Sequence, residues 1–450
     1  MKALRDQLAA QGVHSLLVQF TDIHGVARGK LVPLAHLDDV LAIGAGFSGP
    51  SIWGTGLART GVRSEYYARG IASTAQALPF MPGVARIVGE GFVAGEPFDA
   101  CPRQALARQT ARLAHKHWTL QVGIEPEFFL LKREGTRWLP VDDLDRLDKP
   151  SYDLKSLARQ APFLAQLQDT LQRCGLDVLQ IDHEDAHGQY EVNFAHADAL
   201  ASADRLMLFK LAAHTLAEQQ GAVFSMMPKP FGDQPGSGMH CHVSLWEGKG
   251  DNARNAFAPH RADGSLDTET LLSPIGRQFV GGVLAHAAAL TALAAPTVNS
   301  YKRLTVGESI TGTTWAPAYV AQGYNNRTAL IRTLPSRFEW RAPDASANPY
   351  LLLAGLIAAG LDGIDRGLDA GPDCADDLFA LPLAQIRERG ITLLPQSLAE
   401  AVEALEADAV VAGALGATLT REFCALKRDE ALAWSRHVSD WELERYASAF

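Results

Sequence analysis

Residues 120–131 read LQVGIEPEFFLL, and this stretch decides how the rest of the chain is interpreted. Its apolar run predicts a buried β-strand. Glu125 and Glu127 lie two residues apart, so their side chains point to the same face. The two acids could lie at a solvated strand end, but the phenylalanines that follow at once argue for burial. Buried neighbouring carboxylates repel each other and lose hydration. A divalent cation such as Mg²⁺ or Mn²⁺ would remove that conflict, because it prefers oxygen ligands.

A second acidic segment, HEDAHGQYEVN at residues 183–193, adds Glu184 and Glu191 on either side of a turn at Gly188. Two more acids with apolar neighbours favour a shared metal site. The same segment matches H-E-x-x-H, the pattern of zinc hydrolases, which requires His183 and His187 on one helical face. Because Gly188 follows directly and the segment has little helical character, the hydrolase stays only an alternative.

The glycine loop GSGMHCHVS at residues 236–244 runs into a predicted strand that carries His240, His242 and Ser244 on one face. A lone histidine is more often structural than a ligand. Glycines before the strand permit close approach of the backbone to a bound molecule, which favours a ligand site here.

Arginines gather in the segments that follow. Arg337 and Arg341 flank Glu339 on one strand face, and three further arginines lie upstream at positions 303, 327 and 332. An exposed ladder of ion pairs is one explanation. Arginine also binds phosphate and carboxylate through two parallel hydrogen bonds. Acids for cations, arginines for anions and the lack of a nucleophilic Ser or Cys motif together indicate phosphoryl transfer.

Composition bounds the class of protein. The chain has 450 residues, of which 47% are hydrophobic and 20% charged, with a net charge of −10. This length predicts two domains, and we place the boundary near residue 100. An acidic chain without a basic block argues against nucleic acid as the main partner. Five scattered cysteines, a start without an apolar signal core and apolar runs shorter than a membrane span predict a cytoplasmic protein without membrane contact.

The order of elements predicts an α+β fold. Residues 1–100 contain short strands joined by turns, and a helix is expected from Pro102 to about Trp118. Another helix should end near Gly221, and Asn348 and Ser397 should cap two late helices. Residues 44–49 match G-x-G-x-x-G, the dinucleotide-binding pattern. Because prolines and glycines follow at once, no helix is expected there, and we do not interpret it as a nucleotide site.

Taken together, the blocks of sequence resemble the glutamine synthetase family over nearly the whole chain, and most of all its bacterial type III branch, which includes relatives that make γ-glutamyl derivatives of methylamine. The resemblance rests on FTDIHGVARGKLVP (20–33), GIEPEFFLL (123–131), HEDAHGQYEVN (183–193), MPKPFG (227–232), GSGMHCHVSL (236–245), PTVNSYKRL (296–304), NNRTALIR (325–332), RFEWRAPDASANPYL (337–351) and AAGLDGI (358–364). It implies a small β-grasp-like N-terminal domain, residues 1–100, and a catalytic domain, residues 101–450, with a curved antiparallel sheet and flanking helices. It also implies a homo-oligomer, a dodecamer of two hexameric rings, with active sites between subunits.

The resemblance further implies an ATP-dependent ligase that joins ammonia or a small primary amine to the γ-carboxylate of L-glutamate through γ-glutamyl phosphate, with two or more Mg²⁺ or Mn²⁺ ions. Matched motif by motif, the implied roles are one metal at Glu127, Glu184 and Glu191; another at Glu125, His240 and Glu339; glutamate at Gly236, Arg303 and Arg341; nucleotide and phosphates at His242, Ser244, Arg332 and Arg337; and catalysis at Arg327 and Glu308.

Departures from the family pattern fall at the amine pocket. Ser48 stands where the family usually has an ammonium-attracting aspartate, and Glu308 is one residue away from the usual flap glutamate. Pro235 replaces an asparagine, and the usual adenylylation tyrosine is missing from RGITLLPQS (389–397). A γ-glutamylamide synthetase for an alkylamine or polyamine, and a catalytically inactive homologue, therefore stand as alternatives beside the zinc hydrolase.

Overall fold

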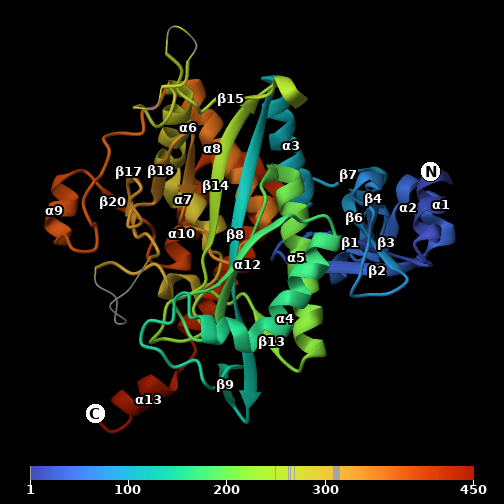
Figure 1. The fold of residues 1–450 in the computed structure, drawn as a ribbon, viewed down its shortest axis with the longest axis horizontal. Coiled ribbons are helices and arrows are strands. Elements are labelled where there is room, and N and C mark those ends of the chain that lie inside the picture. The colour runs from blue at the N-terminus through green and yellow to red at the C-terminus, as the bar shows by residue number, and fades with distance from the viewer. Residues whose placement is uncertain (1, 249, 262, 264, 268, 308–314) are drawn as a thin grey trace.

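Two β-sheets, one on each side of residue 100, organise the chain (Figure 1). The structure is a computed structural model that describes residues 2–248, 250–261, 263, 265–267, 269–307 and 315–450. The α+β class expected from the sequence is confirmed, because strands and helices mix throughout and the large sheet is mainly antiparallel.

The first sheet has the order β2-β1-β6-β4-β3, with β5 and β7 paired to β6. Only the β1–β6 pair is parallel. Its strands are β1 (Ser15–Thr21), β2 (Ala27–Pro33), β3 (Ala45–Ser48), β4 (Glu65–Gly70), β5 (Gln76–Ala77), β6 (Val84–Val93) and β7 (Glu96–Pro97), accompanied by helices α1 (Lys2–Ala10) and α2 (Leu37–Ala42). The G-x-G-x-x-G segment lies in β3 and a single 3-10 turn, Gly49–Ser51, so the expected lack of a nucleotide-binding helix is confirmed.

The second sheet has the order β10-β11-β8-β14-β19-β18-β17, and the long strands β8 and β14 run side by side through the centre of Figure 1. Its strands are β8 (Trp118–Glu134), β9 (Arg137–Pro140), β10 (Val178–His183), β11 (Gln189–Phe194), β12 (Ala197–Asp198), β13 (Val223–Ser225), β14 (Met239–Glu247), β15 (Arg254–Asn255), β17 (Gln322–Tyr324), β18 (Ile331–Leu334) and β19 (Arg337–Trp340). A separate pair joins β16 (Tyr319–Val320) to β20 (Thr392–Leu393).

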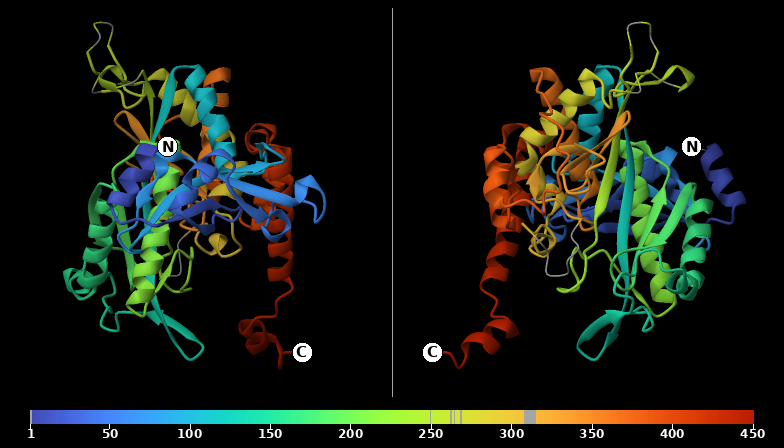
Figure 2. Two further views of the ribbon diagram at one scale, coloured as in Figure 1. Left: turned by 90° about the vertical axis from the view of Figure 1, so that its right-hand side faces the viewer. Right: turned by 60° about the vertical axis from the view of Figure 1, so that its left-hand side comes forward.

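Helices cover this sheet and bury its apolar face. They are α3 (Pro102–His115), α4 (Leu154–Arg173), α5 (Ala199–Gln219), α6 (Pro274–Ala285), α7 (Ala287–Ala294), α8 (Pro349–Arg366), α9 (Leu383–Glu388), α10 (Leu398–Ala407), α11 (Ala409–Leu415), α12 (Ala417–Ser435) and α13 (Asp440–Tyr446). On α5 the apolar residues Leu206, Phe209, Ala213 and Leu216 are all buried, as their spacing predicts. Figure 2 shows α12 running along the body and α13 extending beyond it.

The predicted helix boundaries agree closely with the structure. The Asn348 side chain accepts hydrogen bonds from the amides of Tyr350 and Leu351 and caps α8, and the Ser397 side chain accepts one from Glu400 at the start of α10. The helix that begins at Pro102 ends at His115 rather than at Trp118, because Trp118 already belongs to β8.

Within the described part of the chain, no single helix is both long and apolar enough to cross a membrane. One pair of segments, Ala409–Leu415 and Ala417–Tyr446, satisfies that length and composition only when taken together, and it is bent by 104°.

Candidate active site

A cavity of about 560 Å³ lies against one face of the large sheet. All six predicted metal ligands line it, together with five of the residues expected to bind glutamate or phosphate: Glu125, Glu127, Glu184, Glu191, His240 and Glu339, with Gly236, Arg303, Arg327, Arg332 and Arg341. The sequence segments that supply them lie far apart in the chain, and the strand order brings them to one wall.

The register of the strands explains this meeting. Glu191 on β11 lies opposite Glu127 on β8, and His240 on β14 lies opposite Glu125. Across the next pairing, Glu339 on β19 faces His242. Directly opposed residues point to the same face of a sheet, so the polar side chains of four strands share one surface.

The first cluster consists of Glu127, Glu184 and Glu191, each of which offers a carboxylate oxygen within 4.8 Å of the others. Burial raises the pKa of all three, and repulsion by neighbouring acids adds to that rise, from Glu125 at Glu127 and from cluster members at Glu184 and Glu191. Glu127 is held in place by hydrogen bonds from the Gly238 amide at 2.8 Å and from Gln189 Nε2 at 2.9 Å. The three carboxylates converge although they repel each other, which is the arrangement of a cation site.

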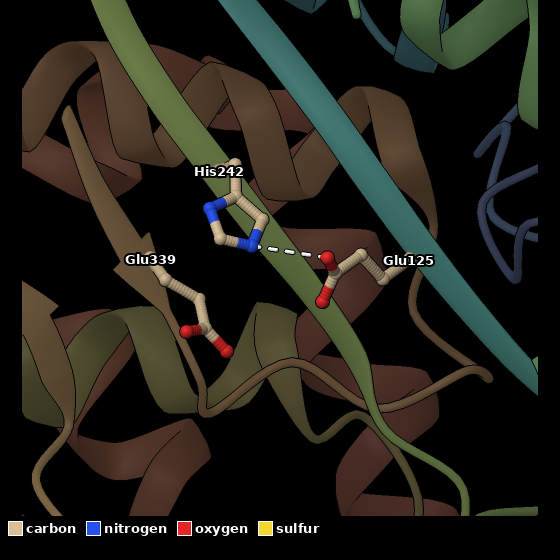
Figure 3. Close-up of side chains that lie close together, drawn as sticks. All are labelled: Glu125, His242 and Glu339. Atoms are coloured by element: carbon tan, nitrogen blue, oxygen red, sulfur yellow. Dashed lines mark ion pairs between the residues drawn. The ribbon is translucent and has the colours of Figure 1, made fainter. Parts of the chain in front are cut away.

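The second cluster contains Glu125, His242 and Glu339 (Figure 3). His242 Nε2 lies 3.0 Å from Glu125 Oε1. Burial would raise the pKa of Glu125, but pairing with His240 and His242 outweighs burial and holds that pKa below its ordinary value. For Glu339, Arg341 and the two histidines likewise outweigh burial and lower the pKa to about 2. Both acids are therefore charged at neutral pH.

His240, the histidine expected in this second set, lies beside the cluster. Its Nδ1 is 3.4 Å from Glu339 and 3.8 Å from Glu125. Its Nε2 is buried and has no hydrogen-bond partner among the described residues. Burial and the neighbouring Arg341 lower its pKa to about 4, which keeps the imidazole neutral and able to bind a metal. The geometry therefore offers two histidines, 240 and 242, to one cation.

Arginines surround the second cluster. Arg341 and Arg332 both pair with Glu339, the latter at 2.8 Å. Arg303 is buried and donates to the carbonyl oxygen of Ala342 at 3.1 Å. Arg327 contributes its backbone carbonyl to Arg341 and lines the cavity. Positively and negatively charged side chains thus alternate along the cavity wall. This is the arrangement that an anionic substrate bound beside metal ions requires.

The donor set fits divalent cations. The first cluster is all oxygen, which suits Mg²⁺ or Mn²⁺, and the second adds imidazole. Glycine at position 238 leaves the space between them open, because a Cβ there would lie 2.8 Å from Glu127 Oε1, 2.8 Å from Arg303 Nη2 and 3.0 Å from His240 Nε2. The unpartnered Nε2 of His240 faces that space.

Four predicted site residues do not line this cavity. His242 joins the second cluster from its edge, and Arg337 donates to His242 Nδ1 at 3.3 Å. Ser244 accepts a hydrogen bond from Trp246 Nε1 instead. Ser48 lines a different hollow in the first sheet, beside Ser51 and Glu65. Glu308 lies outside the described residues.

Other residues also line the cavity, and four of these that were not predicted are Tyr152, Asp182, Asp185 and Trp315. Tyr152 has a φ of 63°, which only glycine adopts readily. Asp182 lies opposite Glu191 in the strand register, and burial raises its pKa to about 6. The alternating pattern of residues 178–183 could have indicated Asp182, and Asp185 lies within the acidic segment HEDAHGQYEVN. Nothing in the sequence around Tyr152 and Trp315 marks those two residues.

The zinc-hydrolase alternative is wrong. His183 ends strand β10, and the following residues form a turn rather than a helix. His183 Nε2 is 2.7 Å from Asp145, while His187 Nε2 is 2.9 Å from the Leu147 carbonyl oxygen. The two rings are thus engaged with different partners and share no helical face. Instead, His183 and Asp145 brace the hairpin that carries Glu184 and Glu191.

Known proteins agree with this architecture. Residues 99–446 match the family described as "Glutamine synthetase, catalytic domain". The chain therefore belongs to the glutamine synthetase family, which confirms the resemblance seen in the sequence.

Among its relatives is a glutamate–methylamine ligase from Methyloversatilis universalis, 46% identical over 438 residues, which cover 97% of each chain. A glutamine synthetase from Rhizobium meliloti is 36% identical over 433 residues, 96% of each chain. A solved structure described as a GmaS/ADP complex, conformation 1, superposes with a TM-score of 0.90 at 36% identity, with full coverage of both chains.

Proposed function

We propose that this protein is an ATP-dependent ligase that joins ammonia or a small primary amine to the γ-carboxylate of L-glutamate. The observation that carries this proposal is the pair of clusters, Glu127–Glu184–Glu191 and Glu125–His242–Glu339, which meet across Gly238 in a wall of arginines. Family membership and the ligase and synthetase relatives support it.

The reaction has two steps. An oxygen of the glutamate γ-carboxylate attacks the γ-phosphorus of ATP, the bond to the β–γ bridging oxygen breaks, and ADP leaves. The amine nitrogen then attacks the carbonyl carbon of γ-glutamyl phosphate, the carbon–oxygen bond to phosphate breaks, and the nitrogen loses a proton to a base. Divalent ions bound by the two clusters would supply charge neutralisation during phosphoryl transfer.

We assign each site residue to the part of the substrates or the metal that it would contact. Arg303, Arg341 and the backbone at Gly236 would bind the charged groups of glutamate. Arg327, Arg332 and Arg337 would hold phosphate oxygens, with His242 and Ser244 on the nucleotide side. His240 would join the second metal set. Glu308 is proposed as a flap carboxylate near the amine.

The amine is proposed to be a small alkylamine such as methylamine, with ammonia accepted more weakly. Two observations support this: the ligase relative at 46% identity acts on methylamine, and Ser48 removes a negative charge where the family usually places an aspartate. Because Ser48 lies outside the cavity of its own chain, we propose that a second copy brings it to the site.

That arrangement accords with a homo-oligomer, proposed as a dodecamer of two hexameric rings. We also propose that residues 1–100 form a separate N-terminal domain and residues 101–450 the catalytic domain. The change of sheet between β7 and β8 supports that boundary. Five free cysteines, four of them buried, support action in the reducing cytoplasm.

Phosphate release with glutamate, ATP, Mg²⁺ and ammonium, methylamine, ethylamine or ethanolamine tests the proposal. Methylamine should give the highest kcat/KM. A Ser48→Asp variant should shift preference toward ammonium, because it restores the attraction for a small cation, while Ser51→Asn, a neutral change in the same hollow, should shift it less. Much the highest kcat/KM for ammonium in the unaltered enzyme would overturn the alkylamine preference, and no phosphate release with any amine would favour an inactive homologue.

A further inference from the structure

A second cavity, of about 660 Å³, lies between α5, α12 and the β1–β2 turn. Its walls are largely apolar, with contributions from Met207 and Leu211 on α5 and from Phe423 on α12. Such a volume with a few polar groups is typical of sites for small molecules. The proposed ligase reaction uses none of these residues.

Lys210 lines this cavity with an ammonium group that has no carboxylate partner among the described residues. Among the residues that the structure describes, no carboxylate oxygen lies within 4.0 Å of its Nζ. Burial lowers the pKa of Lys210 to about 8, and the more distant Asp344 only partly offsets that effect. The cavity's other lysine, Lys427, is already paired with Glu430 at 2.9 Å.

The remaining titratable groups do not supply the missing anion. Glu430 also accepts a hydrogen bond from the amide of Val298 at 3.0 Å, so both its oxygens are engaged. Glu218 lies two helical turns from Lys210, at the exposed end of α5. Burial lowers the pKa of His24 and of His214, so both rings are neutral at physiological pH.

We propose that this cavity binds a small monocarboxylate with a short apolar tail. Its carboxylate would pair with Lys210, with His214 one turn further along the same helix face as a second donor. Its tail would pack against Met207, Leu211 and Phe423. A partly buried ammonium without a counter-ion gains from a charge-assisted hydrogen bond, and the apolar wall selects the tail.

The cavity is connected to the active site through the chain. Three segments line both: Pro296 and Thr297 continue to Arg303, Ala345 and Ser346 follow Arg341, and Met226 precedes Lys229. Asp344 connects the charges of the two sites. It is fully buried, accepts hydrogen bonds from the Ser346 amide and hydroxyl, and attracts both Lys210 and Arg303.

Occupancy should therefore weaken glutamate binding. A carboxylate on Lys210 cancels the positive field of its ammonium, so the negative field of Asp344 at Arg303 is less offset and the site attracts an anionic substrate less strongly. This consequence rests on the proposed function, whereas binding to the cavity does not, so the two can fail separately.

Calorimetric titration of 4-methylpentanoate tests the site. The full-length enzyme is used with saturating Mg²⁺, ADP and glutamate, so that the active site cannot take up the probe. We expect a Kd of about 1 mM or below, weakened about tenfold or more by Lys210→Met, retained in Lys210→Arg and unchanged in Lys2→Met, an exposed helix lysine. Leu211→Trp should abolish binding by filling the cavity.

Equal affinity in the unaltered protein and Lys210→Met would overturn the proposal, as would no binding up to about 10 mM. Displacement of the probe by inorganic phosphate would overturn the assigned ligand class, because phosphate has no apolar tail. In kinetics, 4-methylpentanoate should raise the KM for glutamate several-fold with little change in kcat. The same rise in Lys210→Met would contradict the coupling through Lys210.

Discussion

The Glu127 carboxylate accepts a hydrogen bond of 2.8 Å from the backbone N–H of Gly238. This contact joins the glycine loop to the first carboxylate cluster and fixes the gap between the two proposed metal sets. The gap exists only because residue 238 has no side chain.

Gly238→Ala should therefore lower kcat/KM by about 100-fold, since displacement of catalytic groups by about 1 Å has effects of that order. Its Cβ would crowd Glu127, Arg303 and His240. Gly232→Ala is the matched control, because Gly232 lines the same cavity but a Cβ there meets nothing within 4 Å. Steady-state kinetics of both variants decide the point, and similar losses in both would contradict the account.

Glu184→Gln should raise the Mg²⁺ concentration for half-maximal activity by at least about tenfold, because it removes a charged ligand.

Without metal, the Glu184→Gln variant should be more stable than the parent protein near neutral pH. Burial and Glu127 raise the pKa of Glu184 well above 4.5 in the folded state. The unfolded chain therefore releases this proton first, and stability falls as pH rises from 4.5 toward the raised value. Activity at a series of Mg²⁺ concentrations measures the first effect, and thermal unfolding without Mg²⁺ at several pH values measures the second. A metal-free variant less stable than the parent at neutral pH would contradict the repulsion among the carboxylates.

His286 provides a test away from the active site. Its Nδ1 lies 2.6 Å from Asp408, which caps α11, and its Nε2 lies 2.9 Å from Asp362 on α8. Hydrogen bonding to Asp408 and Asp362 outweighs burial and raises the pKa of His286 above 6.5. The added stability is fully present below pH 6.5 and is lost as pH rises through the higher folded value.

His286→Gln should therefore destabilise the protein by about 1–2 kcal/mol at low pH and by less at high pH. Urea unfolding across that range measures the difference, while kcat should stay unchanged. A destabilisation independent of pH would show that the imidazole is not charged between the two aspartates.

A buried ion network ties the first sheet to the helices. Arg103 on α3 makes two hydrogen bonds to Asp204 on α5, at 3.0 and 2.9 Å, and pairs with Glu90 on β6. Arg103→Met should cost about 3–5 kcal/mol, because it leaves buried carboxylates unpaired. Removal of the exposed Arg277–Asp369 pair by Arg277→Met should cost no more than about 1 kcal/mol. Chemical denaturation of both variants compares them, and equal losses would contradict the importance of burial.

The sequence predicts the central strands of the large sheet and the helix caps better than the residues that reach the site through strand register or from loops. Strand β8 follows from its apolar run, strands β14 and β19 are also expected, and the caps at Asn348 and Ser397 follow from residues whose side chains accept backbone hydrogen bonds. The same-face spacing of Glu125 and Glu127 also anticipates that acids from different segments meet in space.

What the sequence could not predict depends on strand register and on helices packed from distant segments. Asp182 reaches the site because β10 pairs with β11 in one register, and a shift by one residue would turn it away. Tyr152 and Trp315 come from loops without periodic signal. Lys210 lies on α5 between the apolar residues Met207 and Leu211, and only the packing of α12 and the β1–β2 turn shows that it borders a cavity.

The most direct test of the ligase assignment follows one oxygen atom. With glutamate labelled with ¹⁸O in its γ-carboxylate, ATP, Mg²⁺ and methylamine, the released phosphate should carry one ¹⁸O from glutamate, detectable by ³¹P NMR or mass spectrometry. This transfer is required if γ-glutamyl phosphate forms and the amine displaces phosphate at carbon. Phosphate released at the full rate of amide formation without ¹⁸O would contradict the account.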